Sequence, residues 1–116
     1  MQASPTPRSF QVFEYAIRAI EVLRPVVAHI RRQDRDLGEQ LRRALSSAAL
    51  NIAEGNRSEG GVRLSRFSTA AGSNSESRAA LRVAVAWQYV EARDIAPGEA
   101  LLDSVAAMLH RLGARS

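Results

Sequence analysis

The sequence predicts an all-α protein that folds as an up-down antiparallel four-helix bundle. Four segments carry apolar residues at the three- and four-residue spacing of an amphipathic helix, and no segment of useful length alternates as a strand does. The chain of 116 residues has 20 alanines and six aromatic residues, and small side chains let helices approach closely. Because the connections between the segments are short, we expect neighbouring helices to run in opposite directions.

We divide the chain into a flexible N-terminal lead-in at residues 1–9, a single bundle domain at residues 10–113 and a tail at residues 114–116. The first ten residues contain two prolines and no apolar segment, so we do not expect a signal peptide. The longest apolar stretch is shorter than the roughly 20 residues that a membrane span needs. The absence of cysteine excludes disulfides. These features predict a cytoplasmic protein with no membrane partner.

The first helix is predicted at about residues 10–32. Its apolar stripe consists of Phe13, Ala16, Ile17, Ile20, Leu23, Val27 and Ile30. Pro25 lies inside this segment and removes one backbone hydrogen bond, so we expect a kink near Arg24. The polar run at residues 31–36 is the expected connection to the second helix.

The second helix is predicted at about residues 37–56 and the third at about residues 62–93, with a glycine-rich turn between them. The centre of the third helix, Gly72–Ser77, allows two interpretations. Its composition is typical of a loop that starts a new helix through a capping box. It is also compatible with one uninterrupted helix, so local sequence leaves the choice open.

The fourth helix is predicted at about residues 98–112, with Pro97 suited to its first turn and Gly113 to its end. Before it, residues 79–90 are apolar on almost every side, which is more than a small bundle can cover. We therefore expect self-association through a surface that includes Val83, Trp87 and Val90.

A polar stripe runs along the second helix beside its apolar stripe. If the second and third helices are antiparallel about a turn near residue 60, facing residues have numbers that sum to about 120. This register pairs Arg43 with Glu76, Ser47 with Ser73, Asn51 with Thr69, and Glu54 with Arg66. It requires the third helix to be uninterrupted, which we therefore predict. We interpret these eight residues as an interhelical polar ladder that fixes the register, and expect Glu54→Ala or Glu76→Ala to cost a few kcal/mol.

No combination of residues predicts catalysis. His29 and His110 lie in different predicted helices, without an acidic residue at ligand spacing. The glycines at residues 55, 60 and 61 have the spacing of a phosphate loop, but the loop's lysine is missing and the segment follows a helix. We therefore expect no enzyme, no cofactor and no metal.

All 16 basic residues are arginines, and the formal net charge is +4. Arginine binds phosphate through two parallel hydrogen bonds, which makes these residues candidates for contacts with nucleic acid. The candidates are Arg18, Arg31, Arg32, Arg42, Arg63, Arg78 and Arg82. For one protomer, solvation of the bundle surface explains the arginines equally well. Several copies in one oligomer would bind a polyanion with avidity.

The motifs of the second and third helices resemble those of a known family. They are Gln40–Ala44, Ser47, Asn51–Gly55, Phe67, Ala71–Ser73 and Glu76. They are similar to the four-helix bundle proteins encoded in intervening sequences of bacterial 23S ribosomal RNA genes, which in turn resemble accessory proteins of diversity-generating retroelements. The resemblance covers about residues 13–112. This sequence differs from the family pattern at two positions. At Ala49 a proline is common, and the absence of that proline should straighten the second helix. At Asn74 an apolar residue is usual.

The resemblance implies a ring-like homopentamer with a basic surface and a role in binding nucleic acid. The function that we predict is therefore a non-enzymatic, oligomeric bundle that contacts the backbone of RNA or DNA without reading its sequence. In the retroelement relatives, the resemblance implies an adaptor that docks on a reverse transcriptase. The alternative function is accordingly an oligomeric adaptor that recruits a protein such as a reverse transcriptase, with the arginines only solvating its surface.

Overall fold

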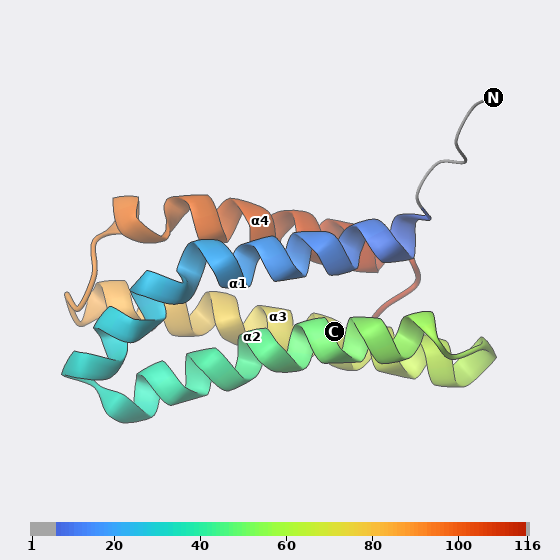
Figure 1. Ribbon diagram of the computed structural model, residues 1–116, viewed down its shortest axis with the longest axis horizontal. Helices are drawn as coiled ribbons and strands as arrows, with labels where there is room; N and C mark the ends of the chain where they lie inside the picture. Colours follow the sequence, from blue (N-terminus) through green and yellow to red (C-terminus); the bar gives the residue numbers. More distant parts are fainter. Residues whose placement is uncertain (1–6, 116) are drawn as a thin grey trace.

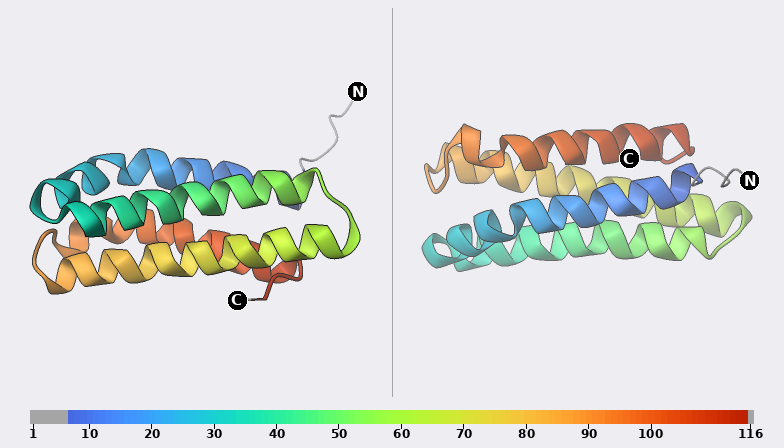
Figure 2. Two further views of the ribbon diagram at one scale, coloured as in Figure 1. Left: turned by 90° about the horizontal axis from the view of Figure 1, so that it is seen from below. Right: turned by 45° about the horizontal axis from the view of Figure 1, so that its top comes forward.

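The computed structural model describes residues 7–115, which form four helices and no strand (Figure 1). The helices are α1 (Arg8–Gln33), α2 (Arg35–Asn56), α3 (Gly60–Ala86) and α4 (Ala92–Arg111). They lie lengthwise beside one another: α1 packs against α2 and α4, and α3 packs against the same two helices (Figure 2). The all-α prediction with four helices is confirmed.

Buried apolar side chains form two core clusters along the bundle. The first core cluster consists of Ala19, Leu23, Val27, Ile30, Leu41, Leu45, Ala80, Leu81, Ala84, Val90, Ile95 and Leu102. The second core cluster consists of Val12, Ala16, Ala49, Ile52, Phe67, Ala70, Ala71, Val105, Leu109 and Ala114. The first cluster lies toward the α1–α2 and α3–α4 connections, and the second toward the α2–α3 turn.

Two buried polar residues of α3, Asn74 and Ser77, lie between these clusters in the sequence. Asn74 is only 1% exposed, and its Nδ2 donates to the carbonyl of Leu102 in α4 over 2.9 Å. Its Oδ1 has no hydrogen-bond partner. The Ser77 hydroxyl donates to the carbonyl of Ser73 in the same helix. The polar side chain of Asn74 therefore lies in the α3–α4 contact.

Helix α1 begins two residues earlier than expected. The backbone N–H groups of Phe10 and Gln11 donate to the Pro7 carbonyl, and Ser9 is already buried. The expected lead-in therefore overlaps the helix at Arg8 and Ser9, and its residues 1–6 lie outside the described residues. Pro25 lies inside the helix, whose ribbon bends in its second half (Figure 1).

The connection between α1 and α2 is one residue, Asp34, rather than the polar run that we expected. The Asp34 N–H donates to the carbonyl of Ile30, and its Oδ1 accepts from the N–H of Leu37 over 3.0 Å. One aspartate thus ends the first helix and caps the second, because its side chain satisfies an N–H group that the new helix leaves unpaired. The flanking arginines therefore remain helical.

Helix α3 runs without interruption through Gly72–Ser77, so the loop interpretation is wrong and the uninterrupted helix is confirmed. Helix α2 is also uninterrupted at Ala49, which is buried. At the turn between them, α2 and α3 approach closely: a Cβ on Gly55 would lie 2.6 Å from Cδ1 of Phe67. No side chain larger than hydrogen fits there without moving the ring.

The boundary between α3 and α4 differs most from the prediction. Helix α3 ends at Ala86, and α4 begins at Ala92, so Pro97 lies inside α4. The earlier start is explained by Asp94, whose Oδ2 accepts from the N–H of Glu91 over 2.9 Å. The connection also contacts α1 and Asp34: Gln33 Nε2 donates to the Tyr89 carbonyl over 2.9 Å, and the Tyr89 hydroxyl donates to Asp34 over 3.1 Å.

Helix α4 ends at Arg111, one residue before the predicted end. Gly113 has a φ of +97°, a conformation that L side chains rarely adopt. Beyond it, Ala114 is buried and the N–H of Arg115 donates to the hydroxyl of Ser68 in α3 over 2.9 Å. Ser116 lies outside the described residues.

Candidate functional site

The polar stripes of α2 and α3 meet at their contact. The hydroxyl oxygens of Ser47 and Ser73 lie 2.8 Å apart, at the register used to align the two helices. Other contacts are shifted from that register. Glu76 accepts from Gln40 over 3.4 Å, and Arg66 donates to Asn51 over 3.4 Å.

The two predicted ion pairs of the polar ladder are not made among residues 7–115. Glu54 forms an ion pair with Arg57, the residue that directly follows α2. Thr69 donates to the carbonyl of Ser65, and Arg43 makes no hydrogen bond or ion pair within the described chain. The register aligns backbones, but an exposed side chain pairs with the nearest group in reach, which on a helix is often three or four residues away.

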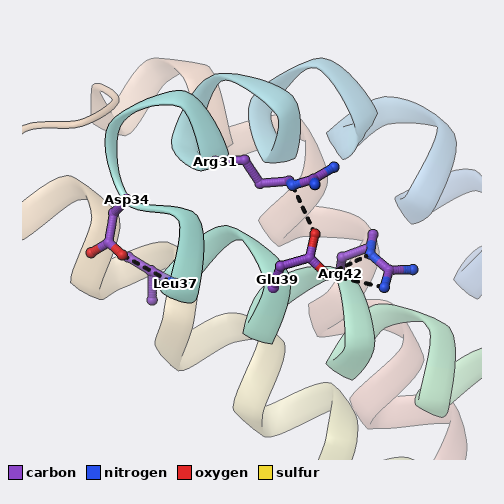
Figure 3. Close-up of polar contacts among 5 residues, drawn as sticks. All are labelled: Arg31, Asp34, Leu37, Glu39 and Arg42. Carbon is purple, nitrogen blue, oxygen red and sulfur yellow. Dashed lines mark hydrogen bonds and ion pairs between the residues drawn. The ribbon is translucent and has the colours of Figure 1, made fainter.

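A groove between α1 and α2, which we call the α1–α2 groove, brings three arginines together over an aliphatic floor. It is lined by Ile20, Arg24, Val27, Ala28, Arg31, Arg42, Leu45 and Ser46. Arg31 Nε lies 2.8 Å from Glu39 Oε1, and Arg42 donates to Glu39 Oε2 over 3.1 and 3.2 Å (Figure 3). The hydrogen bond from Arg42 and the charges of Arg31, Arg42 and Arg43 hold the pKa of Glu39 below its usual range.

The close approach of the two helices at their connection explains why Glu39 reaches Arg31. A Cβ on Gly38 would lie 2.8 Å from Cα of Arg31, so the backbone of α2 lies directly against α1 there. Only a glycine allows this distance. The next residue along α2, Glu39, is therefore held beside the arginine.

A second groove, the α3–α4 groove, has a more polar lining. It is lined by Ala71, Ser75, Arg78, Ala106, His110, Ala114 and Arg115. Arg78 forms an ion pair of 2.8 Å with Asp103 of α4. His110 and Arg115 are exposed. Two arginines, one histidine and one hydroxyl thus face a floor of small side chains.

The remaining predicted arginines lie elsewhere. Arg18 stacks over the ring of Tyr15 at 5.6 Å, and Arg32 contacts His29. Arg63 stacks over Phe67 at 4.8 Å and donates to the Gly55 carbonyl. Arg82 is exposed and makes no ion pair or hydrogen bond within residues 7–115. The structure therefore does not gather the seven candidates on one surface.

Sequence reasoning missed two arginines of the grooves, Arg24 and Arg115. Arg24 could have been found, because Ile20, Arg24, Val27 and Arg31 recur at helical spacing and share one side of α1. Arg115 could not, because it follows the last helix and reaches the α3–α4 groove only through the turn at Gly113.

The apolar surface predicted for self-association is divided by the fold. Val83 is 43% exposed and Trp87 is 66% exposed. Val90 is 8% exposed and belongs to the first core cluster, because the connection after Ala86 folds it back into the bundle. Further exposed apolar side chains that the sequence did not single out are Phe10, Val22, Leu50, Val62 and Leu64.

No group of three or more His, Cys, Asp or Glu side chains among residues 7–115 could hold a metal ion. Within the same range, no helix combines the length and the apolar character that crossing a membrane requires.

The chain matches the model of the family described as 23S rRNA-intervening sequence protein over residues 8–111. The matched range contains all four helices. Neither a curated protein nor a solved structure matches the chain significantly.

Proposed function

Because the chain belongs to the 23S rRNA-intervening sequence protein family, we propose that it is a non-enzymatic, oligomeric protein of the cytoplasm that binds the phosphate backbone of RNA or DNA. The α3–α4 groove carries this proposal. Arginine side chains and hydroxyl groups are the usual partners of phosphate oxygens, and they position a nucleic acid without reading its bases. Arg78, Arg115 and Ser75 provide these groups in one groove.

The chemistry of this groove favours the backbone over the bases. No Phe, Tyr or Trp side chain lines it, and His110 is its one ring, so it offers little surface on which successive bases could stack. Its alanines leave room for a phosphate to approach the arginines. Asp103 competes for Arg78, but an exposed ion pair of this kind contributes only about 0–1 kcal/mol, so a phosphate can replace it.

We further propose that the helices follow the up-down antiparallel order and that five protomers assemble into a ring. The short connections, of which Asp34 alone forms the first, support the antiparallel order. The exposed Val83 and Trp87 support assembly, since large apolar side chains are seldom exposed together without a partner. One protomer of net charge +4 offers few phosphate contacts, and five copies multiply them.

The test is binding of fluorescein-labelled RNA and DNA of mixed sequence, measured by anisotropy over a range of salt concentrations. We expect log K to fall linearly with log salt, by about 0.7 per phosphate contact on a single strand. The double variant Arg78→Ala/Arg115→Ala should weaken binding to all sequences and reduce the slope by about 1 to 2. Arg93→Ala is the matched control, because Arg93 is exposed, pairs with Glu91 and lies outside both grooves.

Absent or salt-insensitive binding by the parent protein would contradict the proposal. It would favour the alternative adaptor, which recruits a protein such as a reverse transcriptase without touching nucleic acid. The mass of the assembly, measured by sedimentation, tests the pentamer separately. A monomer at micromolar concentration would exclude it.

A further inference from the structure

The α1–α2 groove has a different chemistry from the α3–α4 groove and does not suit a polynucleotide. We propose that it binds an acidic amphipathic helix of a partner protein. Its floor is formed by Ile20, Val27, Ala28 and Leu45, and its rim by three arginines. A ligand that fits must therefore present aliphatic groups and carboxylates together.

A nucleic acid lacks the aliphatic groups that the floor of this groove requires. The only uncharged polar side chain in the lining is Ser46, and its hydroxyl already donates to the carbonyl of Arg42 over 2.9 Å. No aromatic ring is present for stacking. A base in this groove would place its polar edges against hydrocarbon, which is unfavourable without hydrogen bonds. Aliphatic side chains of a protein suit the floor better.

The shape of the lining indicates a helix rather than a short loop. On α1 the lining extends from Ile20 to Arg31 at intervals of three and four residues, so it forms one stripe about 16 Å long. This length is about three helical turns. A partner helix lying along it would place aliphatic residues at i, i+4 and i+7 on the floor, the usual pattern of a helix bound in a groove.

The charges of the rim specify an acidic partner. Among residues 7–115, Glu39 is the one carboxylate bonded to the rim, and it contacts Arg31 through Nε and Arg42 through Nε and Nη2. Arg24 makes no ion pair or hydrogen bond within the described chain. The Arg31 side chain is 44% exposed and that of Arg42 53%. Arg24 and the outer faces of the other two guanidinium groups are therefore available to carboxylates of a partner.

The test uses a fluorescein-labelled 18-residue peptide that is helical, with leucines along one face and glutamates on both sides of it. Its affinity for the full-length protein is measured by anisotropy. We expect the parent to bind the peptide with a Kd in the micromolar range. In Arg24→Glu and in Ala28→Trp the Kd should rise at least about tenfold. The second variant fills the groove without changing the charge, and Ala28 is exposed, so the bundle can accommodate it.

The matched controls are Arg82→Glu and Ala79→Trp. Both positions are exposed on α3, outside the groove, and both substitutions repeat the chemical change. Their affinities should stay within about twofold of the parent. A peptide with lysine in place of glutamate should not bind. The proposal is overturned if the acidic peptide fails to bind the parent at about 100 μM. It is also overturned if the groove variants bind the acidic peptide as tightly as the parent does, or if the parent binds the lysine peptide as tightly as the acidic one.

Two further outcomes assign the groove to another occupant and also overturn the proposal. If Ala28→Trp weakens RNA binding as much as it weakens peptide binding, the groove belongs to nucleic acid. If the same variant changes the sedimenting mass, a second copy of this chain covers the groove. The proposed phosphate site is tested independently, because Arg78→Ala/Arg115→Ala should leave the affinity for the peptide unchanged.

Discussion

The two ends of the bundle share one kind of contact, a large side chain packed against a glycine, but the side chain is aliphatic at one end and aromatic at the other. At each end one large side chain lies against a glycine: Leu23 against Gly98 in the first core cluster, and Phe67 against Gly55 in the second. The first cluster contains only aliphatic side chains, whereas the second is built around Phe67, the largest fully buried side chain of the described residues. Different substitutions should therefore weaken the two ends.

The ends also differ in how their connections are held. At the first end, polar contacts join the α1–α2 connection to the α3–α4 connection through Gln33, Asp34 and Tyr89. At the second end, Arg63 stacks over Phe67 and donates to the Gly55 carbonyl. Hydrogen bonds between connections secure the first end, while packing around one ring secures the second.

The largest loss of stability is expected when the ring of Phe67 is removed. Phe67→Ala removes the side chain that fills the second core cluster, and such truncations cost about 3–5 kcal/mol of unfolding free energy. Leu23→Ala at the first end should cost about 2–5 kcal/mol. Urea denaturation measures both values. A loss below about 1 kcal/mol for Phe67→Ala would contradict its central role in the second core cluster.

The two glycine contacts come next. Gly98→Ala places a Cβ 2.9 Å from Cδ1 of Leu23, and Gly55→Ala places one against the ring of Phe67, so each should cost about 1–3 kcal/mol through overpacking. The cost should fall for Gly98→Ala in a Leu23→Ala background and for Gly55→Ala in a Phe67→Ala background. Additive losses in these double-mutant cycles would show that the contacts are not responsible.

Asn74 lies between the two clusters and should respond in the opposite direction. Asn74→Leu removes a buried oxygen that has no hydrogen-bond partner, and the Leu102 carbonyl lies in a helix that can satisfy it. We expect a gain of about 1 kcal/mol in unfolding free energy. Asn74→Ala, which removes the same oxygen but leaves a void, is the comparison. An Asn74→Leu variant that is no more stable than the parent would rule out this explanation.

Tyr89→Phe tests the hydrogen bond from the Tyr89 hydroxyl to Asp34 at the first end of the bundle. Desolvation, together with the hydrogen bond to Asp34, raises the pKa of Tyr89 above its usual value of 10.0. A raised folded-state pKa contributes stability that is present below the unfolded-state value and is lost as pH rises through the folded-state value. The parent should therefore lose stability above about pH 10 more steeply than Tyr89→Phe. Urea midpoints between about pH 8 and pH 11 measure the difference, and parallel curves would contradict it.

The smallest effect is expected for the acidic residues of the polar ladder. Glu54 pairs with Arg57 just beyond α2, Glu76 has its one hydrogen bond within residues 7–115 to Gln40, and both contacts are exposed. Glu54→Ala and Glu76→Ala should therefore cost less than about 1 kcal/mol, rather than the few kcal/mol that the predicted ion pairs implied. Thermal melts of both variants decide between the two values.

The sequence predicted the α3 continuity well because a long-range argument was available. Ser47 and Ser73 could be placed opposite each other only if Gly72–Ser77 was helical, and their hydroxyls do meet. Local composition alone favoured a loop there. Burial against α2 and α4 outweighs the weak helix propensity of glycine and serine.

Other features depended on single side chains whose partners sequence does not reveal. Asp34 and Asp94 shift helix boundaries because each satisfies a backbone N–H. The start of α4 was predicted too late because Pro97 suits a first turn, whereas it lies inside the helix. The charged pairs of the ladder were wrong because exposed side chains bind whichever group lies nearest. The two grooves arise where helices meet, so they required the tertiary structure.

The single residue between α1 and α2 also bears on the order in which the chain folds. Closing so short a connection costs little entropy, so α1 and α2 can associate as a local hairpin. The contact between α1 and α4 joins opposite ends of the chain and has the greatest sequence separation. We therefore expect the α1–α2 groove to form early, before α4 closes the bundle.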